Sequence, residues 1–262
     1  MKDDYKVDVI LPVFNGSKTI HASLISVLNQ KGHWINKIIV INDGSTDNTL
    51  QIVKQLNNSL IHLYNTDNRG VSSARNFGVE KSTAEWIAFI DADDLWEFEK
   101  IDLQLKIARN NNVNFICSSV DNRIKIRSHL ISPWSLIRGN FIATSSVLVK
   151  RDVLLSIQPP FSRNMSFAED YLTWLKCLAI TSGYYESSKL VSYTLSDYPR
   201  YKMHQILKNL YYLNLEYRSY IYQQNFSLKK KFQLSIIVNI SCILSLLSIF
   251  KRFILIKEDR KF

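Results

Sequence analysis

Three carboxylates stand within four positions at the end of an apolar run, because WIAFI leads directly into Asp91, Asp93 and Asp94. In an extended chain residues i and i+2 point the same way, so Asp91 and Asp93 can reach one point. Carboxylates held that close repel each other unless a cation or a shared proton lies between them. Mg²⁺ and Mn²⁺ prefer oxygen ligands and are often completed by substrate phosphates. The stretch therefore predicts a metal site that holds a diphosphate, with a solvated acidic turn as the alternative.

Two arginines and another aspartate could serve the same ligand. Arg69 and Arg75 flank a segment rich in Ser, Ala and Gly, where small side chains let the backbone approach a ligand and an arginine fork matches phosphate oxygens. Asp43, in the turn NDG, could accept hydrogen bonds from a base or a ribose. Taken singly, each has a plain structural alternative, a surface ion pair for the arginines and an ordinary turn residue for Asp43.

A later segment carries two further acids. SFAEDYLTWLKCLAI, residues 166–180, predicts a helix in which Ser166 and Glu169 have the spacing of a capping box. Asp170 then falls in the first turn, where the helix dipole favours its ionised form. Acids at this position are common in ordinary helices, so this segment alone leaves the role of Asp170 open.

The elements that must position these residues alternate between strands and helices. In chain order the sequence predicts strand 7–13, helix 17–30 with Ser17 as N-cap, strand 37–41, helix 49–57, strand 60–64, helix 71–81, strand 86–90, helix 97–109, and strands 114–120 and 143–149. Apolar strands in βαβ order predict a largely parallel α/β sheet with helices on both faces. Such sheets bind ligands beyond the carboxyl ends of their strands, where the acidic turns fall. The absence of GxGxxG and GxxxxGK[ST] after any strand disfavours a dinucleotide fold and a P-loop.

Four segments in order resemble the signatures of family 2 glycosyltransferases, which are inverting enzymes with the GT-A fold. They lie within residues 7–180 and read VDVILPVFNG, IIVINDGSTDNT, NRGVSSARNFGVEKSTAEWIAFIDADD and FAEDYLTWLK. The resemblance implies a GT-A (nucleotide-diphospho-sugar transferase) fold, a mostly parallel sheet flanked by helices. We expect a catalytic domain over 1–200, with a nucleotide-sugar half to about 96 and an acceptor half from about 97, and a basic, apolar, helical appendage over 201–262.

The same resemblance implies roles in binding the nucleotide sugar. Asp43 takes the place of the aspartate that contacts the base. Pro12 and Phe14, at the end of the first strand, line the nucleotide slot. Arg69 and Arg75 take the positions that approach the nucleotide and its diphosphate.

The metal and the catalytic base also follow from the resemblance. Asp91 lies near the ribose and Asp93 on the metal, Mn²⁺ or Mg²⁺, with Asp91 as a possible second ligand. Asp170 takes the place of the catalytic base, which accepts the proton of the acceptor hydroxyl while a divalent ion offsets the charge of the leaving diphosphate. In many relatives a histidine or an arginine-rich patch follows the last core strand and touches the metal or the phosphate. Here Arg200, Lys202 and, as a further metal-ligand candidate, His204 match that pattern only loosely.

We therefore expect an enzyme, an inverting glycosyltransferase that moves a sugar from a nucleotide sugar, a UDP-sugar, to a hydroxyl of a glycan or a lipid-linked saccharide. Bacterial surface-polysaccharide biosynthesis uses such reactions. One alternative is a metal-dependent nucleotidyltransferase, although FNGSKT is a poor version of its lysine-bearing phosphate loop. The other is a non-enzymatic lipid-binding protein, which gives no reason for carboxylates at sheet and helix ends.

Charge is distributed unevenly along the chain. The net charge is +10, but residues 1–197 carry 21 basic and 20 acidic side chains, whereas residues 198–262 carry 12 basic and 3 acidic ones. A front part so nearly neutral does not indicate nucleic-acid binding. Cys117, Cys177 and Cys242 stand in apolar contexts without CxxC spacing, which predicts buried, reduced thiols in the cytosol, and the polar N-terminus does not resemble a secretory signal.

The basic tail contains an uncharged run over residues 232–250, with Lys229–Lys231 before it and two basic residues after it. It could lie in the membrane interface, cross the bilayer, or pack as a buried helix on the domain. The tyrosine-rich segment 203–222 before it favours a half-wet boundary. We expect contact with a membrane surface through 203–252, which would place the protein in the cytoplasm, peripheral at the inner face of the bacterial plasma membrane.

Overall fold

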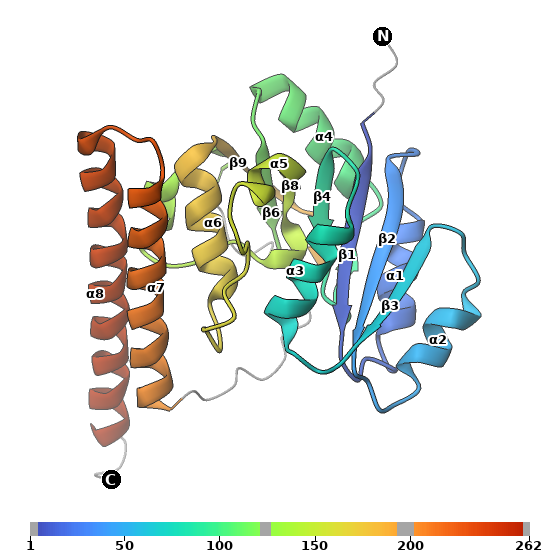
Figure 1. Cartoon of the computed structure of the whole chain (residues 1–262), viewed down its shortest axis with the longest axis horizontal. Helices are drawn as coiled ribbons and strands as arrows, with labels where there is room; N and C mark the ends of the chain where they lie inside the picture. Colours follow the sequence, from blue (N-terminus) through green and yellow to red (C-terminus); the bar gives the residue numbers. More distant parts are fainter. Residues whose placement is uncertain (1–4, 121–126, 193–201, 259–262) are drawn as a thin grey trace.

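The structure, a computed structural model, describes residues 5–120, 127–192 and 202–258, and over 247–258 only the course of a helix. Within these residues a central sheet of eight strands carries helices on both faces (Figure 1). In order across the sheet, the strands are β3 (Ile61–Thr66), β2 (Ile35–Asp43), β1 (Val7–Val13), β4 (Trp86–Phe89), β8 (Leu148–Lys150), β6 (Phe115–Ser119), β9 (Gly183–Lys189) and β7 (His129–Ile131).

The first half of the sheet is parallel, as the apolar strands predict. β1 pairs in parallel with β2 and with β4, and β2 pairs in parallel with β3. All seven residues of β1 are buried, because helices cover both of its faces. The carboxyl ends of these strands therefore meet at one edge of the sheet, the lower edge in Figure 1.

In the second half of the sheet, β8 runs antiparallel to both of its neighbours, β4 and β6, and its direction shapes the site. β8 lies antiparallel to β4, with Ala88 opposite Leu148. Continuing the same register three residues further sets Asp91 opposite Ser145. The residues that precede β8 thus lie beside the residues that follow β4, at the carboxyl edge.

Helices divide the core into two layers. The helices are α1 (Ile20–Leu28), α2 (Thr49–Gln55), α3 (Val71–Lys81), α4 (Lys100–Asn111), α5 (Arg151–Leu155), α6 (Glu169–Ile180), α7 (Met203–Gln223) and α8 (Leu228–Glu258). Buried side chains of α1, α2 and α4 pack on one face of the sheet, and those of α3, α5, α6, α7 and α8 on the other. Two 3-10 turns, η1 (Pro133–Leu136) and η2 (Thr144–Ser146), and a small sheet of β5 (Leu95–Trp96) with β10 (Val191–Ser192) complete the described elements.

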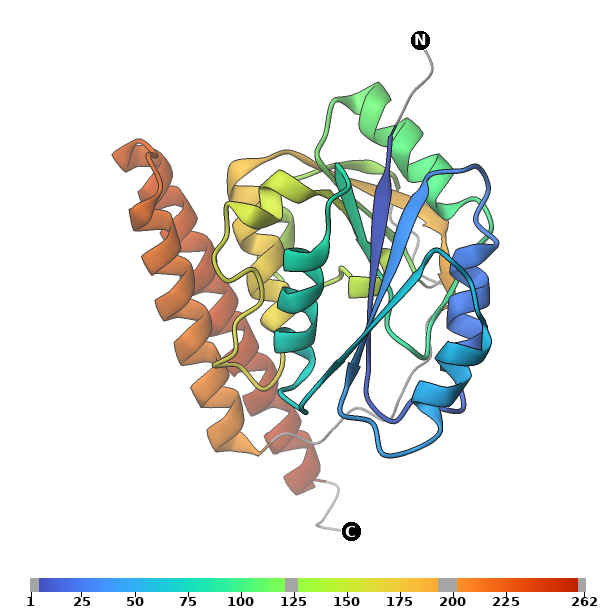
Figure 2. The ribbon, with the colours of Figure 1, turned by 45° about the vertical axis from the view of Figure 1, so that its right-hand side comes forward.

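The C-terminal region forms a hairpin of two long helices. α7 and α8 run side by side along one flank of the domain (Figures 1 and 2). Leu213 and Tyr217 of α7 and Leu234, Ile237 and Val238 of α8 are buried in the core. Among the described residues, no helix combines the length and the apolar character needed to cross a membrane. One face of the predicted apolar run therefore packs on the domain.

Local sequence signals misplace two boundaries. The strand predicted over 143–149 is instead the turn η2 followed by β8, because backbone hydrogen bonds close a tight turn within Ala143–Val147. Ser17 is not the N-cap of α1, which begins at Ile20. The N–H of Ser17 instead donates to Asp47 Oδ2 at 3.0 Å, so this residue belongs to the loop.

The cysteines are free thiols, as predicted. Cys117 and Cys177 are buried, and burial raises the pKa of both. Cys242, on the hairpin, is only half-buried, so the prediction of three buried thiols is wrong at this position. Its helix α8 turns one face to the core and the other away from it.

Candidate active site

The acidic cluster follows β4 at the carboxyl edge of the sheet. Asp91 and Asp93 are half-buried, and burial, followed by the charge of Asp91, raises the pKa of Asp93. The two carboxylates therefore act on each other, as their spacing predicts. Asp94 is buried instead, and its Oδ2 accepts a hydrogen bond of 2.5 Å from Ser145 Oγ. Asp94 thus holds the turn in place and leaves the first two aspartates toward solvent.

The donor set limits how a metal ion could bind here. Among the residues that the structure describes, no three His, Cys, Asp or Glu side chains are grouped to hold a metal. Oδ1 of Asp91 already pairs with Arg75, so Asp91 and Asp93 together offer few oxygens as metal ligands. Two neighbouring carboxylates suit a hard divalent ion that takes its remaining ligands from phosphate and water. The residues present fit such an ion and do not form a closed site.

Arg75 joins the strand end to the late helix. Its guanidinium is buried, with Nη2 at 2.8 Å from Asp91 Oδ1 and Nη1 at 2.8 Å from Glu169 Oε1. It also lies 5.5 Å from the centre of the Phe161 ring. Although burial alone would lower it, the charges of Asp91 and Glu169 raise the pKa of Arg75, which therefore stays charged. The arginine is a fixed bridge between residues far apart in the sequence.

Glu169 is the other end of that bridge and not a capping residue. α6 begins at Glu169, and Ala168 before it adopts a left-handed conformation with φ of 59° and makes no side-chain cap. Ser166 therefore does not form the capping box that its spacing predicts. The Glu169 carboxylate instead pairs with Arg75, because the tertiary ion pair is available to it.

Asp170 follows directly and is half-buried in the first turn of α6. Its Oδ2 accepts hydrogen bonds from Asn140 Nδ2 and Thr144 Oγ1, both at 3.2 Å, and its Oδ1 accepts one from the N–H of Tyr171 at 2.6 Å. Burial and the charge of Glu169 raise the pKa of Asp170 to about 6, against the opposing effect of Arg75 and the hydrogen bonds. A carboxylate with this pKa is ionised at neutral pH yet basic enough to take a proton.

Asp43, the last residue of β2, organises the loop between β3 and α3. Its carboxylate is buried and accepts hydrogen bonds from the N–H groups of Arg69 and Gly70, at 3.0 and 2.8 Å, and from Thr66 Oγ1 at 3.1 Å. Gly70 has φ of 85°, a conformation that favours glycine. The Arg69 side chain is exposed beside Asp67. Asp43 and Arg69 line a cavity of about 550 Å³ between β3 and α3.

Three of the remaining predicted positions, Pro12, Phe14 and His204, lie in the part of the chain that the structure describes. Pro12 is buried in β1, and Phe14 just after it is 51 % exposed. His204 is exposed in the first turn of α7. This helix starts at the lower end of the molecule in Figure 1, where the carboxyl ends of β1 and β2 also lie. Arg200 lies outside the described residues.

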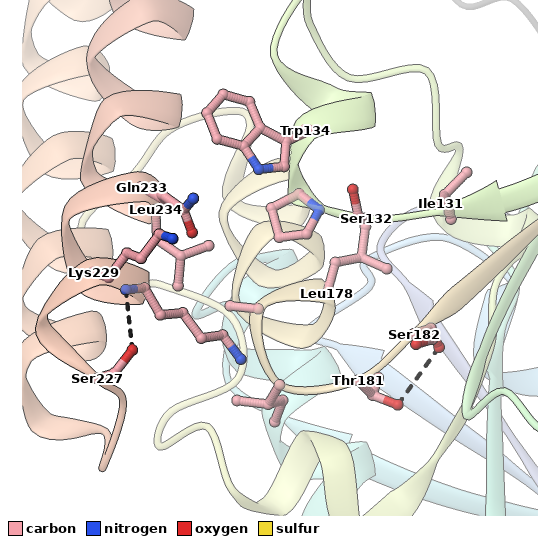
Figure 3. Close-up of a pocket in the computed structure, with 14 residues that line it drawn as sticks. Ile131, Ser132, Trp134, Leu178, Thr181, Ser182, Ser227, Lys229, Gln233 and Leu234 are labelled. Atoms are coloured by element: carbon pink, nitrogen blue, oxygen red, sulfur yellow. Dashed lines mark hydrogen bonds between the residues drawn. The ribbon is translucent and has the colours of Figure 1, made fainter.

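A second cavity, of about 430 Å³, lies at the opposite end of α6 (Figure 3). It is bounded by η1, by the last turn of α6 and by the start of α8, with Trp134, Leu178 and Lys229 among its lining. Asp170 lies in the first turn of α6 and Leu178 in the last. This cavity is therefore separate from the carboxylates.

Sequence reasoning missed several residues that build the site. They are Asn140, Thr144 and Ser145; it also missed that Asp94 holds the turn and that Glu169 is an ion-pair partner. One signal was present, because an antiparallel strand after residue 143 would set Ser145 beside Asp91. The ion pair of Arg75 with Glu169 spans 94 residues and has no local signal.

A protein-family model described as "Glycosyl transferase family 2" matches residues 8–154. A curated protein of Escherichia coli, "UDP-Glc:alpha-D-GlcNAc-diphosphoundecaprenol beta-1,3-glucosyltransferase WfgD", is 32% identical over 185 residues. The alignment covers 67% of this chain and 71% of that protein.

Two solved structures share the arrangement of sheet and helices. S. aureus TarS 1-349 in complex with UDP matches with a TM-score of 0.72 at 19% identity, over 88% of this chain and 69% of that one. The mannosyltransferase PcManGT from Pyrobaculum calidifontis, in complex with GDP-Man and Mn2+, matches with a TM-score of 0.68 at 17% identity, over 91% and 69%. At these identities the likeness is one of fold.

Proposed function

The chain belongs to glycosyltransferase family 2 and has the GT-A fold, and from this premise we propose that it transfers a sugar, with inversion, from a UDP-sugar to a hydroxyl of a lipid-linked saccharide. The name of WfgD, with its UDP-Glc donor and diphosphoundecaprenol acceptor, supports this choice, as does the UDP complex of TarS. The reaction would serve bacterial surface-polysaccharide biosynthesis. A nucleotidyltransferase and a non-enzymatic lipid-binding protein, the alternatives that the sequence left open, do not agree with the family.

One observation carries the proposal: Arg75 bridges Asp91 at the strand end and Glu169 beside Asp170. Asp91, the carboxylate proposed to bind the donor, and Asp170, the carboxylate proposed as the base, are thereby fixed at one edge of the sheet. Transfer of a sugar needs both, because the diphosphate must be held while the attacking hydroxyl loses its proton.

We assign the nucleotide to the loops after β1 and β2. The exposed ring of Phe14 offers a stacking surface for the base, and Pro12 supports it from the strand. Asp43 retains one lone pair on Oδ2 beyond its loop hydrogen bonds, with which it could accept from the base. The guanidinium of Arg69, exposed and paired with the exposed Asp67, could turn to the nucleotide and diphosphate, whereas the buried Arg75 is engaged by two carboxylates.

We assign a divalent ion, Mn²⁺ or Mg²⁺, to Asp93, with Asp91 beside it and His204 as a further candidate ligand. When bound, such an ion would offset the negative charge that develops on the leaving diphosphate. Burial and the charge of Asp91 raise the pKa of Asp93, and a cation would relieve both effects on the ionised pair, which is the physical reason that it suits this place. The Mn2+ complex of PcManGT is consistent with it.

Asp170 is the proposed catalytic base. It would accept the proton of the acceptor hydroxyl as that oxygen attacks the anomeric carbon from the face opposite the leaving diphosphate, which inverts the configuration. Burial and Glu169 raise its pKa to about 6, closer to neutrality than that of an exposed aspartate. This makes it a stronger base that is still ionised at pH 7.

A lipid-linked acceptor calls for a membrane surface, and we assign that contact to the outer face of the α7–α8 hairpin. The exposed apolar side chains among the described residues of the hairpin are Leu207, Tyr211, Leu215, Tyr222, Leu228, Phe232, Ile243 and Leu244. The lysines at 229–231 add positive charge at its turn, while Glu216 is turned inward, where it accepts from Ser162 Oγ at 2.7 Å. Such a face suits anionic lipid. The protein would then act at the cytoplasmic face of the plasma membrane.

The donor site is tested by a thermal-shift panel of UDP, UDP-glucose, UDP-GlcNAc and GDP-mannose, with and without Mn²⁺. We expect UDP compounds at 100 times their Kd to stabilise the protein by about 2.7 kcal/mol, and more strongly with Mn²⁺. Asp93→Ala should lose the Mn²⁺-dependent part of the shift, whereas Asp152→Ala, at an exposed position of α5, should keep it. Metal-dependent UDP affinity that survives in Asp93→Ala would count against the site.

A further inference from the structure

The turn η2 contacts both chemical centres of the site with adjacent residues. Ser145 Oγ accepts the N–H of Asp91 at 2.9 Å and donates to Asp94. Thr144, the residue before it, donates its hydroxyl to Asp170 Oδ2 at 3.2 Å. One peptide unit therefore separates the group that holds the donor end from the group that holds the base.

The position of η2 is fixed by buried neighbours. Trp96 Nε1 donates to the carbonyl of Ser145 at 2.9 Å, and Gln104 Nε2 donates to the carbonyl of Ser146 at 2.7 Å. The buried Lys100 Nζ donates to Gln104 Oε1 and lies 4.2 Å from the centre of the Trp96 ring. Since β8 follows η2 directly and pairs with β4, the turn cannot move without disturbing the sheet.

The hydrogen bonds of Asp170 distinguish its two oxygens. Among the described residues, Oδ2 accepts from both Thr144 and Asn140, whereas Oδ1 accepts only from the N–H of Tyr171. Each carboxylate oxygen has two lone pairs, so Oδ2 is filled and Oδ1 retains one. The donors on Oδ2 thereby leave Oδ1 as the oxygen that can accept a further hydrogen bond.

We propose that Thr144 is a positioning residue, held through Ser145 to the donor end of the site, that aims Asp170 at the acceptor hydroxyl with the help of Asn140. This inference rests on the proposed function of Asp170 as base. Thr144 touches neither donor nor acceptor and acts through the carboxylate of Asp170. The adjacent residues Thr144 and Ser145 thereby keep the base at a constant distance from the donor carboxylates.

The charged groups that face Asp170 are Glu169 from its own helix and Arg75 from α3, while the donors from η2 and the loop before it are neutral. A hydrogen bond to the ionised carboxylate favours ionisation. Loss of the Thr144 hydroxyl should therefore raise the pKa of Asp170, and with it the midpoint of the pH–rate profile.

The test compares Thr144→Val, which keeps the shape but removes the hydroxyl, with Thr144→Ser, which restores it. The rate is UDP release from the UDP-sugar that binds best in the thermal-shift panel, with water as acceptor, from pH 5 to 8.5. We expect the midpoint of kcat/KM to rise by about half to one pH unit in Thr144→Val, with KM for the donor unchanged. The rate at pH 6 would then fall several-fold more than the rate at pH 8, and Thr144→Ser should recover the wild-type midpoint.

Asn140→Ala, at an exposed position, removes the other donor to Oδ2 and should move the midpoint in the same direction even where Thr144→Val does not fold. Wild-type midpoints in both variants, beside an inactive Asp170→Asn, would overturn the role of Thr144 while leaving the base in place. Full turnover in Asp170→Asn would instead remove the base assignment, and this inference with it.

Discussion

Ionising Asp170 costs the folded protein stability, and the cost can be derived from its surroundings. Burial and the charge of Glu169 raise its pKa from 3.8 to about 6. Each tenfold change in acidity is worth about 1.36 kcal/mol, so the ionised carboxylate at pH 7.5 destabilises the fold by about 3 kcal/mol at most. Asp170→Asn removes that charge, although its amide fits the Asn140 and Thr144 donors less well. We expect about half the gain, which is about 1.5 kcal/mol or 3–6 °C in Tm.

The gain should depend on pH with a definite sign. The pKa of Asp170 is higher in the folded protein than in the unfolded chain, so its stabilising contribution is fully present below about pH 4 and is lost as the pH rises through about 6. At pH 5 the folded wild type has already bound most of that proton. The destabilisation by Asp170 is then about 1.6 kcal/mol, which the poorer fit of the amide, the same at both pH values, nearly offsets. The Tm difference between Asp170→Asn and wild type should therefore fall from about 3–6 °C at pH 7.5 to near zero at pH 5.

Differential scanning fluorimetry at the two pH values measures this difference, and UDP release measures turnover. Asp152→Asn is the matched control, because Asp152 is an exposed acid in the first turn of α5 and should lose up to about 1 kcal/mol when its helix-dipole interaction is removed. A variant that is inactive yet more stable would support the reasoning. An unchanged Tm at both pH values would refute the strained environment of Asp170, and retained turnover would refute its role.

Two further predictions concern the bridge and the hairpin. Arg75→Met leaves Glu169 buried without its partner and should lower the free energy of unfolding by about 3–5 kcal/mol in urea titrations. Arg75→Lys, which keeps a single point charge, should recover part of that loss. Equal stability of Arg75→Met and the wild type would contradict the bridge. Replacing Lys229 and Lys230 together by Gln should lower the affinity for phosphatidylglycerol vesicles, measured by sedimentation, by about 30-fold, at about 1 kcal/mol for each lysine. UDP binding should stay intact. Undiminished vesicle binding would argue against membrane contact through this face of the hairpin.

The sequence predicts well the parts of the fold that depend on local pattern. The helix predicted over 71–81 is observed as Val71–Lys81, and the strand predicted over 7–13 as Val7–Val13. In each segment the pattern of small or apolar residues matches only one kind of element. It fails where tertiary contacts overrule a local signal. Glu169 has the spacing of a capping residue, but an arginine 94 positions earlier claims its carboxylate. No window of the sequence contains both partners, so local pattern could not have found the pair.

The span of the family model contains the proposed donor site but not the proposed base. It ends at residue 154, whereas Asp170 and its neighbour Glu169 lie beyond it. The base assignment therefore rests on the resemblance of the segment FAEDYLTWLK and on geometry, and both groups that anchor it, Arg75 and Thr144, lie inside the matched span. Each anchor reaches back to the same strand end, one through the side chain of Asp91 and one through its backbone N–H by way of Ser145. Two independent links to one residue thus hold both acids of the first turn of α6 at the end of β4, while the buried side chains of the helix anchor the rest of it in the core.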